Sequence, residues 1–282
     1  MSRVAYVNGR YLPFAEAKVH VEDRGYQLAD GVYEVMAVKG GRLRRADQHM
    51  ARLDRSLAAL RIAPPMSHGA LRVVIAEVVR RNRVADGIVY LQVTRGVAKR
   101  DHAFPRTGEP SLVLTARATR PRTAEWRTGV GVITIPDIRW KRPDIKSIAL
   151  LPNVLGKQQA VEAGAFEAWM VDDDGFVTEG TSTNAWIVTR KGELVTHQAD
   201  TSILHGVTRA VVLEAAGGAG LEVVERPFTV AEAKRAAEAF LTSTTSAVMP
   251  VVRIDGAPVG DGKPGAVTRR LMQLVERADD GG

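Results

Sequence analysis

The chain has 282 residues, of which 45% are hydrophobic and 25% charged, as in an ordinary globular protein. This length predicts two domains or one large one, with enough chain to bury a substantial core. Cysteine is absent, which excludes disulfides, thiolate metal sites and a cysteine nucleophile. No apolar stretch approaches the roughly 20 residues of a membrane span, and the first residues lack a signal-peptide core. We therefore expect a cytoplasmic protein.

The net charge is +7, from 39 lysines and arginines against 32 acidic residues. This excess raises the alternative of a non-catalytic basic protein that binds nucleic acid. The arginines are scattered between carboxylates, however, and the sequence contains no DNA-binding motif or aromatic RNA-binding set. Most of the positive charge is arginine, so the few lysines, which can act as amine nucleophiles, can be considered one by one.

The first part of the chain combines hairpins with helices. Asn8-Gly9 is a two-residue turn signal and predicts a hairpin between strands at 4–7 and 10–14. Further along, the pattern predicts a second hairpin from 32–38 to 42–43, helices over 47–62 and 71–79, and strands over 88–94 and 111–115. This order favours a mixed α+β domain with an antiparallel sheet.

The second part also mixes strands and helices, without a regular strand–helix alternation. Residues 116–127 lack periodicity and are interpreted as a connection. The elements expected after it are strands at 130–135, 165–171, 175–178, 184–188, 240–241 and 251–254, and helices at 153–163, 207–216, 231–238 and 266–277. We therefore predict a small N-terminal domain at 1–117, a linker at 118–121 and a larger domain at 122–282.

Two segments together indicate a monophosphate site. Gly206-Val207-Thr208 opens a predicted helix, where free N–H groups and the helix dipole favour an anion. Taken by itself, this segment is explained as an ordinary helix cap. The hydroxyl run at 242–246 adds donors, although a polar turn explains that run alone. Arg52 or Arg55, on the first predicted helix, is a candidate to complete the site, unless both lie on a solvated face.

Lys146 is a candidate nucleophile because it lies between a polar loop and the apolar run 148–151. Burial favours the neutral amine, which is the nucleophilic form. The alternative is a lysine at a strand end that reaches water. Glu179 precedes Gly-Thr-Ser-Thr-Asn, where a carboxylate can equally serve a turn. No phosphate-loop, dinucleotide or zinc pattern is present, and the histidines lack metal-ligand spacing, so we expect no metal.

Seven motifs, in order, make the chain resemble the fold-type IV pyridoxal-phosphate enzymes, and among them the bacterial D-amino-acid aminotransferases. The motifs are EDRGYQLADGVYE (22–34), HMARL (49–53), QVTRG followed by Arg100-Asp101-His102 (92–102), DIKSIALLPNVLGKQ (144–158), EGTSTN (179–184), ILHGVTR (203–209) and TSTTS (242–246). The resemblance implies a two-domain fold, α+β or α/β, with pyridoxal 5'-phosphate in the cleft between the domains, and a homodimer.

The resemblance also implies roles for individual residues. Lys146, carried by the larger domain, would form the Schiff base with the cofactor, Glu179 would pair with the pyridine nitrogen, and Leu204 would pack against the ring. The phosphate would be held by Arg52 rather than Arg55, together with Val207, Thr208, Ser243 and Thr244. Tyr33, Arg100 and His102 would hold the substrate carboxylate, with His102 donated by the neighbouring subunit. The loop that follows Arg139 is expected to border the pocket.

The implied activity is a ping-pong transfer of the amino group from a D-amino acid, such as D-alanine or D-glutamate, to a 2-oxo acid such as 2-oxoglutarate. Three related activities share the lysine, glutamate and phosphate motifs and remain alternatives. They are branched-chain L-aminotransferase, (R)-amine transaminase and aminodeoxychorismate lyase. The Arg-x-His motif at 100–102 favours the D-amino-acid interpretation.

Overall fold

The computed structural model describes residues 3–280 and the side chains of residues 3–278. The chain forms two compact units. Unit 1 comprises Met1–Arg120 and Ile145–Ala149, and unit 2 comprises Pro121–Asp144 and Leu150–Gly282.

Unit 1 is built on a six-stranded antiparallel sheet with the order β2-β1-β6-β5-β3-β4. Its strands are β1 (Val4–Val7), β2 (Arg10–Pro13), β3 (Gly31–Lys39), β4 (Arg42–Leu43), β5 (Gly87–Thr94) and β6 (Ser111–Ala118). Asn8 and Gly9 both have positive φ, at 43° and 89°, as the predicted two-residue turn requires. The first predicted hairpin is therefore confirmed.

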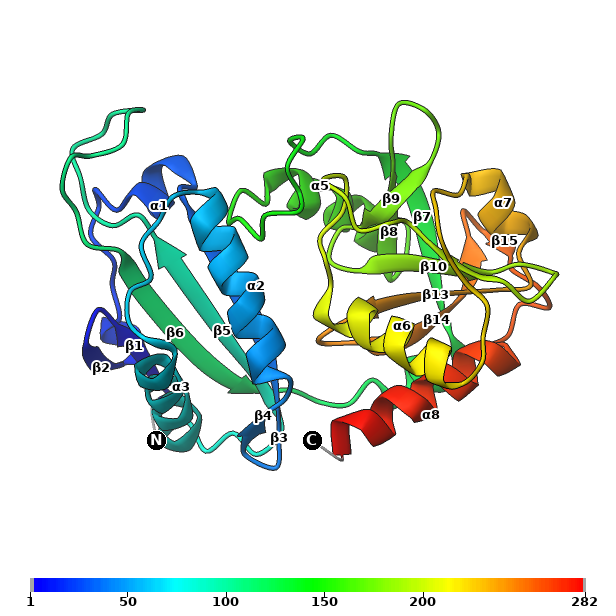
Figure 1. Cartoon of the computed structure of the whole chain (residues 1–282), viewed down its shortest axis with the longest axis horizontal. Coiled ribbons are helices and arrows are strands. Elements are labelled where there is room, and N and C mark those ends of the chain that lie inside the picture. The colour runs from blue at the N-terminus through cyan, green and yellow to red at the C-terminus, as the bar shows by residue number, and fades with distance from the viewer. Residues whose placement is uncertain (1–2, 281–282) are drawn as a thin grey trace. The chain divides into compact units, whose positions relative to one another are not determined.

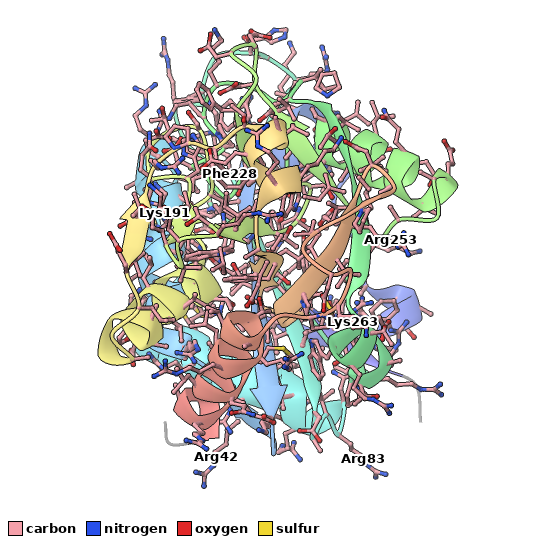
Figure 2. The ribbon with its side chains drawn as sticks, turned by 90° about the vertical axis from the view of Figure 1, so that its right-hand side faces the viewer. Arg42, Arg83, Lys191, Phe228, Arg253 and Lys263 are labelled. Atoms are coloured by element: carbon pink, nitrogen blue, oxygen red, sulfur yellow. The ribbon has the colours of Figure 1, made fainter. Side chains whose placement is uncertain are left out.

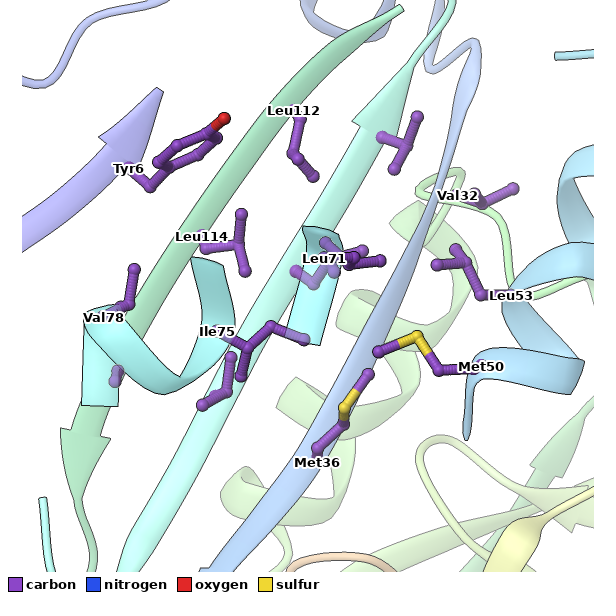
Figure 3. Close-up of a cluster of buried hydrophobic side chains, with 14 of the residues drawn as sticks. Tyr6, Val32, Met36, Met50, Leu53, Leu71, Ile75, Val78, Leu112 and Leu114 are labelled. Carbon is purple, nitrogen blue, oxygen red and sulfur yellow. The ribbon is translucent and has the colours of Figure 1, made fainter. Parts of the chain in front are cut away.

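Helices α2 (Ala46–Ala59) and α3 (His68–Arg81) supply the apolar side chains that cover this sheet. The unit also contains the short helices η1 (Phe14–Glu16) and α1 (Arg24–Leu28). Figure 3 shows Met50 and Leu53 of α2, and Leu71 and Ile75 of α3, among side chains that rise from the strands. The three- and four-residue spacing that predicted both helices is thus the spacing of their buried faces.

Unit 2 contains a nine-stranded mixed sheet, in which β12-β11-β10-β13-β14-β7-β8-β9 are successive neighbours and β15 pairs with β14. The strands are β7 (Val130–Pro136), β8 (Glu167–Val171), β9 (Val177–Gly180), β10 (Asn184–Val188), β11 (Leu194–Thr196), β12 (Val223–Glu225), β13 (Glu238–Ser243), β14 (Ala247–Ile254) and β15 (Ala257–Pro258). Trp186 stacks on Phe240 across β10 and β13, with ring centres 5.4 Å apart. This aromatic pair joins the centre of the sheet to the core beneath it.

The helices of unit 2 are α4 (Thr123–Thr128), α5 (Leu151–Glu162), α6 (Val207–Gly218), α7 (Val230–Arg235) and α8 (Ala266–Asp280). Figure 1 shows α6 and α8 running side by side. Val212 of α6 and Leu271 of α8 are fully buried in one cluster with Trp186. The middle of α6 is therefore held in place by a packed core.

The structure corrects the sequence-based elements at three places. Residues 116–127 are not a structureless connection, because β6 pairs with β5 as far as Ala118 and α4 follows. The predicted helix 231–238 ends at Arg235, because Glu238 already pairs with β10 as part of β13. Strands β11 and β12 were missed, because three residues are too few to show a periodicity.

The structure also places Lys146 differently from the sequence-based division. The sequence assigned it to the larger domain, whereas Ile145–Ala149 packs within unit 1. The reason is backbone pairing with β3: Val32 and Ser147 form an antiparallel bridge, and Ile148 donates to the Gly31 carbonyl at 3.0 Å. Hydrogen bonds to a distant strand leave no local pattern, so the sequence could not indicate them.

Much of the positive charge lies on the surface. Arg42, Arg83 and Arg253 are exposed, and Figure 2 shows their side chains extending outward from the ribbon. Arg24 and Arg52 are buried instead, and each contacts a carboxylate. Within residues 3–280, no helix has the length and apolar character needed to cross a membrane.

Shortening a side chain in the unit 1 core should destabilise the protein. Leu53 is 2% exposed, so Leu53→Ala should lower the free energy of unfolding by about 2–5 kcal/mol through lost burial and a residual cavity. Val73 of α3 is 68% exposed, and Val73→Ala should change stability by less than about 0.5 kcal/mol. Urea unfolding followed by circular dichroism measures both. Equal losses in the two variants would contradict the proposed core.

Candidate active site

Lys146 lies beside β3 and is held there through its backbone. Its carbonyl accepts a hydrogen bond from the Tyr33 amide at 3.0 Å, and its own amide donates to the Ser56 hydroxyl at 3.2 Å. The Lys146 Nζ atom lies 4.1 Å from the centre of the Tyr33 ring. The structure therefore brings together two residues that the sequence analysis selected from positions more than a hundred residues apart.

A buried group of charges links the same strand to α2. Glu34 is fully buried, and its two carboxylate oxygens accept hydrogen bonds from Nε and Nη2 of Arg52, both at 2.8 Å. The His49 Nδ1 atom is 2.8 Å from Glu34 Oε2. Burial raises the pKa of Glu34, but Arg52, the His49 hydrogen bond and the charge of Lys146 outweigh burial and bring this pKa to about 2. Glu34 is therefore ionised and fixes the direction of the Arg52 guanidinium.

The sequence analysis named Arg52 but not its partners. Glu34 and His49 both fall inside motifs quoted for the family resemblance, which was the only available signal. Burial lowers the pKa of His49, with smaller contributions from Arg52 and Lys146, while Glu34 opposes the change. A neutral His49 can donate to Glu34 through Nδ1–H. Arg55, the alternative to Arg52, is exposed on α2.

Glu179 forms the corresponding group in unit 2. It lies at 5% exposure on β9, and its Oε1 accepts from the Leu204 amide at 3.0 Å and from Arg139 Nη1. Its Oε2 accepts from the Asn184 side-chain amide at 2.9 Å. Burial raises the pKa of Glu179, and Arg139 and the Leu204 amide partly offset this rise. A buried carboxylate with increased basicity is suited to share a proton with a ring nitrogen.

Arg139 is the main residue in this unit whose role the sequence did not indicate. Its side chain is 5% exposed and lies between Glu179 and Asp137, with Nη2 2.7 Å from Asp137 Oδ2. The same nitrogen donates to the Ser202 carbonyl at 3.2 Å. Burial lowers the pKa of Arg139, but the two carboxylates outweigh burial and raise it overall. Arg139 therefore holds Glu179 in place, a contact across 40 positions that no local motif reports.

The predicted phosphate residues of unit 2 converge at Asn184. The Asn184 side chain donates to the Leu204 carbonyl at 3.0 Å, and its backbone lies opposite Thr242, directly before Ser243 and Thr244. A Cβ atom at Gly206 would overlap Asn184 Oδ1, so only glycine fits before α6.

Gly206 caps α6 without a side-chain hydrogen bond. The first-turn amides at Val207 and Thr208 therefore have no acceptor from a capping side chain, which suits an anion at this helix end. The half-buried residues Thr208, Ser243 and Thr244 carry hydroxyls that can also donate. These residues of unit 2 fit a phosphate group. The Lys146 amine of unit 1 and the Glu179 carboxylate of unit 2 are, each by its own chemistry, groups that fit the aldehyde and the ring nitrogen of pyridoxal 5'-phosphate.

The Arg100 and His102 side chains are not bonded to these groups. Both are exposed in the segment after β5, and neither forms a hydrogen bond or ion pair with another described side chain. Tyr33 instead stacks against Tyr90, with ring centres 5.8 Å apart. The predicted carboxylate-binding trio is therefore not joined by bonds within one chain.

The Glu34 charge should make stability pH-dependent. Its pKa is about 2 in the folded protein against an ordinary value of 4.5, so the unfolded chain binds the proton first as the pH falls. The contribution of Glu34, on the order of 3 kcal/mol, should be fully present above pH 4.5 and lost between pH 4.5 and about 2. Urea unfolding across this window should show a flatter profile for Glu34→Gln than for the wild type.

The exposed Glu109 provides a matched control, and Glu109→Gln should follow the wild-type profile. Parallel profiles for the wild type and Glu34→Gln would show that Glu34 is not stabilised in its charged form.

Comparison with known proteins gives a consistent assignment. Residues 31–254 match the family model described as amino-transferase class IV. The D-alanine aminotransferase of Bacillus licheniformis is 42% identical over 96% of this chain and 95% of its own length. That of Listeria monocytogenes is 41% identical over 95% and 93%.

Solved structures agree with this assignment. The T.th. branched-chain amino acid aminotransferase, solved with pyridoxamine 5'-phosphate, is 27% identical and superposes with a TM-score of 0.91 over 100% of this chain and 95% of that one. The corresponding Escherichia coli enzyme has a TM-score of 0.92 at 23% identity, over 100% and 96%, which shows a shared fold. The chain therefore belongs to the class IV aminotransferases.

Proposed function

We propose that this protein is a pyridoxal-phosphate-dependent transaminase that transfers the amino group of a D-amino acid to a 2-oxo acid. D-alanine or D-glutamate would be the donor and 2-oxoglutarate an acceptor, in a ping-pong cycle. The observation that carries the proposal is the amine of Lys146, held against Tyr33 beside a buried charged network. The D-alanine aminotransferases at 38–42% identity support the substrate class. Family membership leaves the non-catalytic nucleic-acid-binding alternative without support.

Each predicted site residue would have a role that follows from its side-chain chemistry. When bound, the cofactor supplies an aldehyde that accepts an amine and a pyridine ring that withdraws electrons from the substrate Cα. Lys146 would hold it and would move the proton at Cα. Glu179 would keep a proton on the ring nitrogen, and Leu204 would pack against the ring. Arg52, Val207, Thr208, Ser243 and Thr244 would hold the phosphate.

Substrate orientation would fall to Tyr33, Arg100 and His102. Together they would bind the α-carboxylate, so that one face of Cα meets Lys146 and the D configuration is selected. Because Arg100 and His102 bond to no other side chain described in their own unit, we propose a homodimer in which His102 of the partner subunit completes the site. A cytoplasmic location is part of the same proposal.

A branched-chain L-aminotransferase is the second candidate, because solved enzymes of that name superpose with TM-scores of 0.91 and 0.92. Their identities of 27% and 23% are lower than those of the D-alanine enzymes, so the fold they share does not decide the substrate. (R)-amine transaminase and aminodeoxychorismate lyase have no comparable observation in their favour.

Borohydride reduction of the cofactor-loaded protein tests the role of Lys146. The reduced cofactor should remain covalently attached, and mass spectrometry should locate it on the peptide that contains Lys146. Lys146→Ala should retain no adduct and should lose about 10⁴-fold or more in turnover, since the nucleophile and the proton carrier are removed together. Lys157→Ala provides a lysine control from the same motif and should retain the adduct. An adduct on another lysine would reject the assignment.

A panel of single half-reactions tests the substrate class. The visible absorbance of the bound cofactor should change on addition of D-alanine or D-glutamate and should change little with their L forms or with L-leucine. The expected preference is at least about 10²-fold in the half-reaction rate, because only one face of Cα meets Lys146. Conversion by L-leucine without conversion by D-alanine would support the branched-chain alternative.

A further inference from the structure

The segment that carries Arg100 and His102 is exposed, yet its backbone accepts hydrogen bonds from a buried arginine. Arg24 of α1 is 3% exposed. Its Nη1 atom donates to the Asp101 carbonyl at 2.6 Å and to the Ala103 carbonyl at 3.3 Å. These two carbonyls flank His102 on either side. A single guanidinium therefore restrains the backbone on both sides of His102, two residues after Arg100.

Asp30 holds Arg24 in this position and links it to a second arginine. Asp30 Oδ2 accepts from Arg24 Nε at 2.8 Å and from Arg95 Nε at 2.7 Å, and Asp30 Oδ1 accepts from Arg95 Nη2 at 2.9 Å. Burial raises the pKa of Asp30, but its hydrogen bonds with Arg95 and Arg24 outweigh burial and lower this pKa overall. The bridging group is therefore a carboxylate with a guanidinium on each side.

Arg95 connects this pair to the end of α2. Its Nη2 and Nη1 atoms donate to the Leu60 carbonyl at 2.7 Å and to the Arg61 carbonyl at 2.9 Å. Its guanidinium also lies 3.7 Å from the centre of the Phe104 ring, and that of Arg61 lies 4.7 Å from it. Phe104 follows Ala103 directly, so the far end of the segment contacts two guanidinium groups, and that of Arg95 is bonded to the backbone at the end of α2.

The near end of the segment is fixed as well. Asp23 and Val97 form an antiparallel bridge, and Gly96 has φ +91° with the Glu109 carbonyl in the place that a Cβ atom would occupy. Anchors at both ends leave residues 99–103 as a short exposed arch. The Arg24 contacts are to the backbone of this arch and not to a helix or strand. Ordering an exposed arch costs conformational entropy and therefore adds little to the stability of the fold. Stability alone thus does not account for the network.

We propose that Arg24, Asp30 and Arg95 form a positioning network that presents Arg100 and His102 in the geometry needed to bind the substrate carboxylate. This inference rests on the proposed function of Arg100 and His102. Because the network fixes the arch before substrate arrives, the entropy of ordering it does not reduce the binding free energy. Arg24, Asp30 and Arg95 are positioning residues, which touch neither cofactor nor substrate.

Loosening the arch should raise KM for D-alanine by about tenfold or more and leave kcat within about threefold. Arg24→Gln removes the Nη1 contacts to the two carbonyls. Arg24→Lys should recover only part of the affinity, because a single ammonium cannot reproduce the planar group that bonds Asp30 through Nε and the carbonyls through Nη1. Amide hydrogen exchange over residues 98–104 should quicken by at least about tenfold in Arg24→Gln, with or without cofactor. Cofactor affinity should stay unchanged.

A second variant, at a surface position, tests the network in case Arg24→Gln does not fold. Phe104 is 46% exposed, so Phe104→Leu removes the cation contacts without opening the core and should shift KM and exchange in the same direction. Arg72→Gln, which breaks the exposed Arg72–Asp47 pair of the same unit, should change neither.

The two measurements separate this proposal from the proposed function. Unchanged exchange in Arg24→Gln and Phe104→Leu would overturn the network as an anchor, and faster exchange with an unchanged KM would overturn its role in substrate binding. A wild type that converts neither D-alanine nor D-glutamate would refute the proposed function, while hydrogen exchange would still report whether the anchor exists.

Discussion

The candidate site of unit 1 depends on the pairing of Ile145–Ala149 with β3. The chain leaves unit 2 at Asp144, runs along β3 through the Val32–Ser147 bridge and returns at Leu150. This pairing places the Lys146 amine beside Tyr33 and within the electrostatic field of Glu34. Because successive side chains on paired strands face opposite sides, a shift of one residue would turn Lys146 away from Tyr33.

Buried pairs of arginine and carboxylate recur around the predicted site residues. Glu34 pairs with Arg52 in unit 1, Glu179 pairs with Arg139 in unit 2, and Asp30 lies between Arg24 and Arg95. Removing one partner of such a pair leaves a buried uncompensated charge, at a cost of about 3–5 kcal/mol. Because of this cost, each pair holds its side chains in one orientation, which suits the roles that we propose for Arg52, Glu179 and Arg24. The net positive charge is therefore a mixture of solvated surface arginines and a few structural ones.

Sequence reasoning found most of the elements, because long amphipathic helices and turn signals are local. It recovered α2 and α3 from their apolar spacing and the first hairpin from Asn8-Gly9. It missed β11 and β12, which exist only through pairing with neighbouring strands. The same limit applies to the site. Lys146 could be selected from the sequence because an apolar run follows it. Arg139 has no such local pattern, and its role is visible only from its contact with Glu179.

The sequence by itself determined the chemistry available to this protein: a lysine in an apolar setting, a helix that begins at glycine, a hydroxyl run and a family resemblance that the comparisons confirm. The tertiary structure decided which charges are paired and where each group is held. It joined Glu34 to Arg52, Glu179 to Arg139, and Arg24 to the backbone around His102. The physical reason is that burial and ion pairing depend on residues distant in the chain, so they emerge only when the sheets and helices have packed.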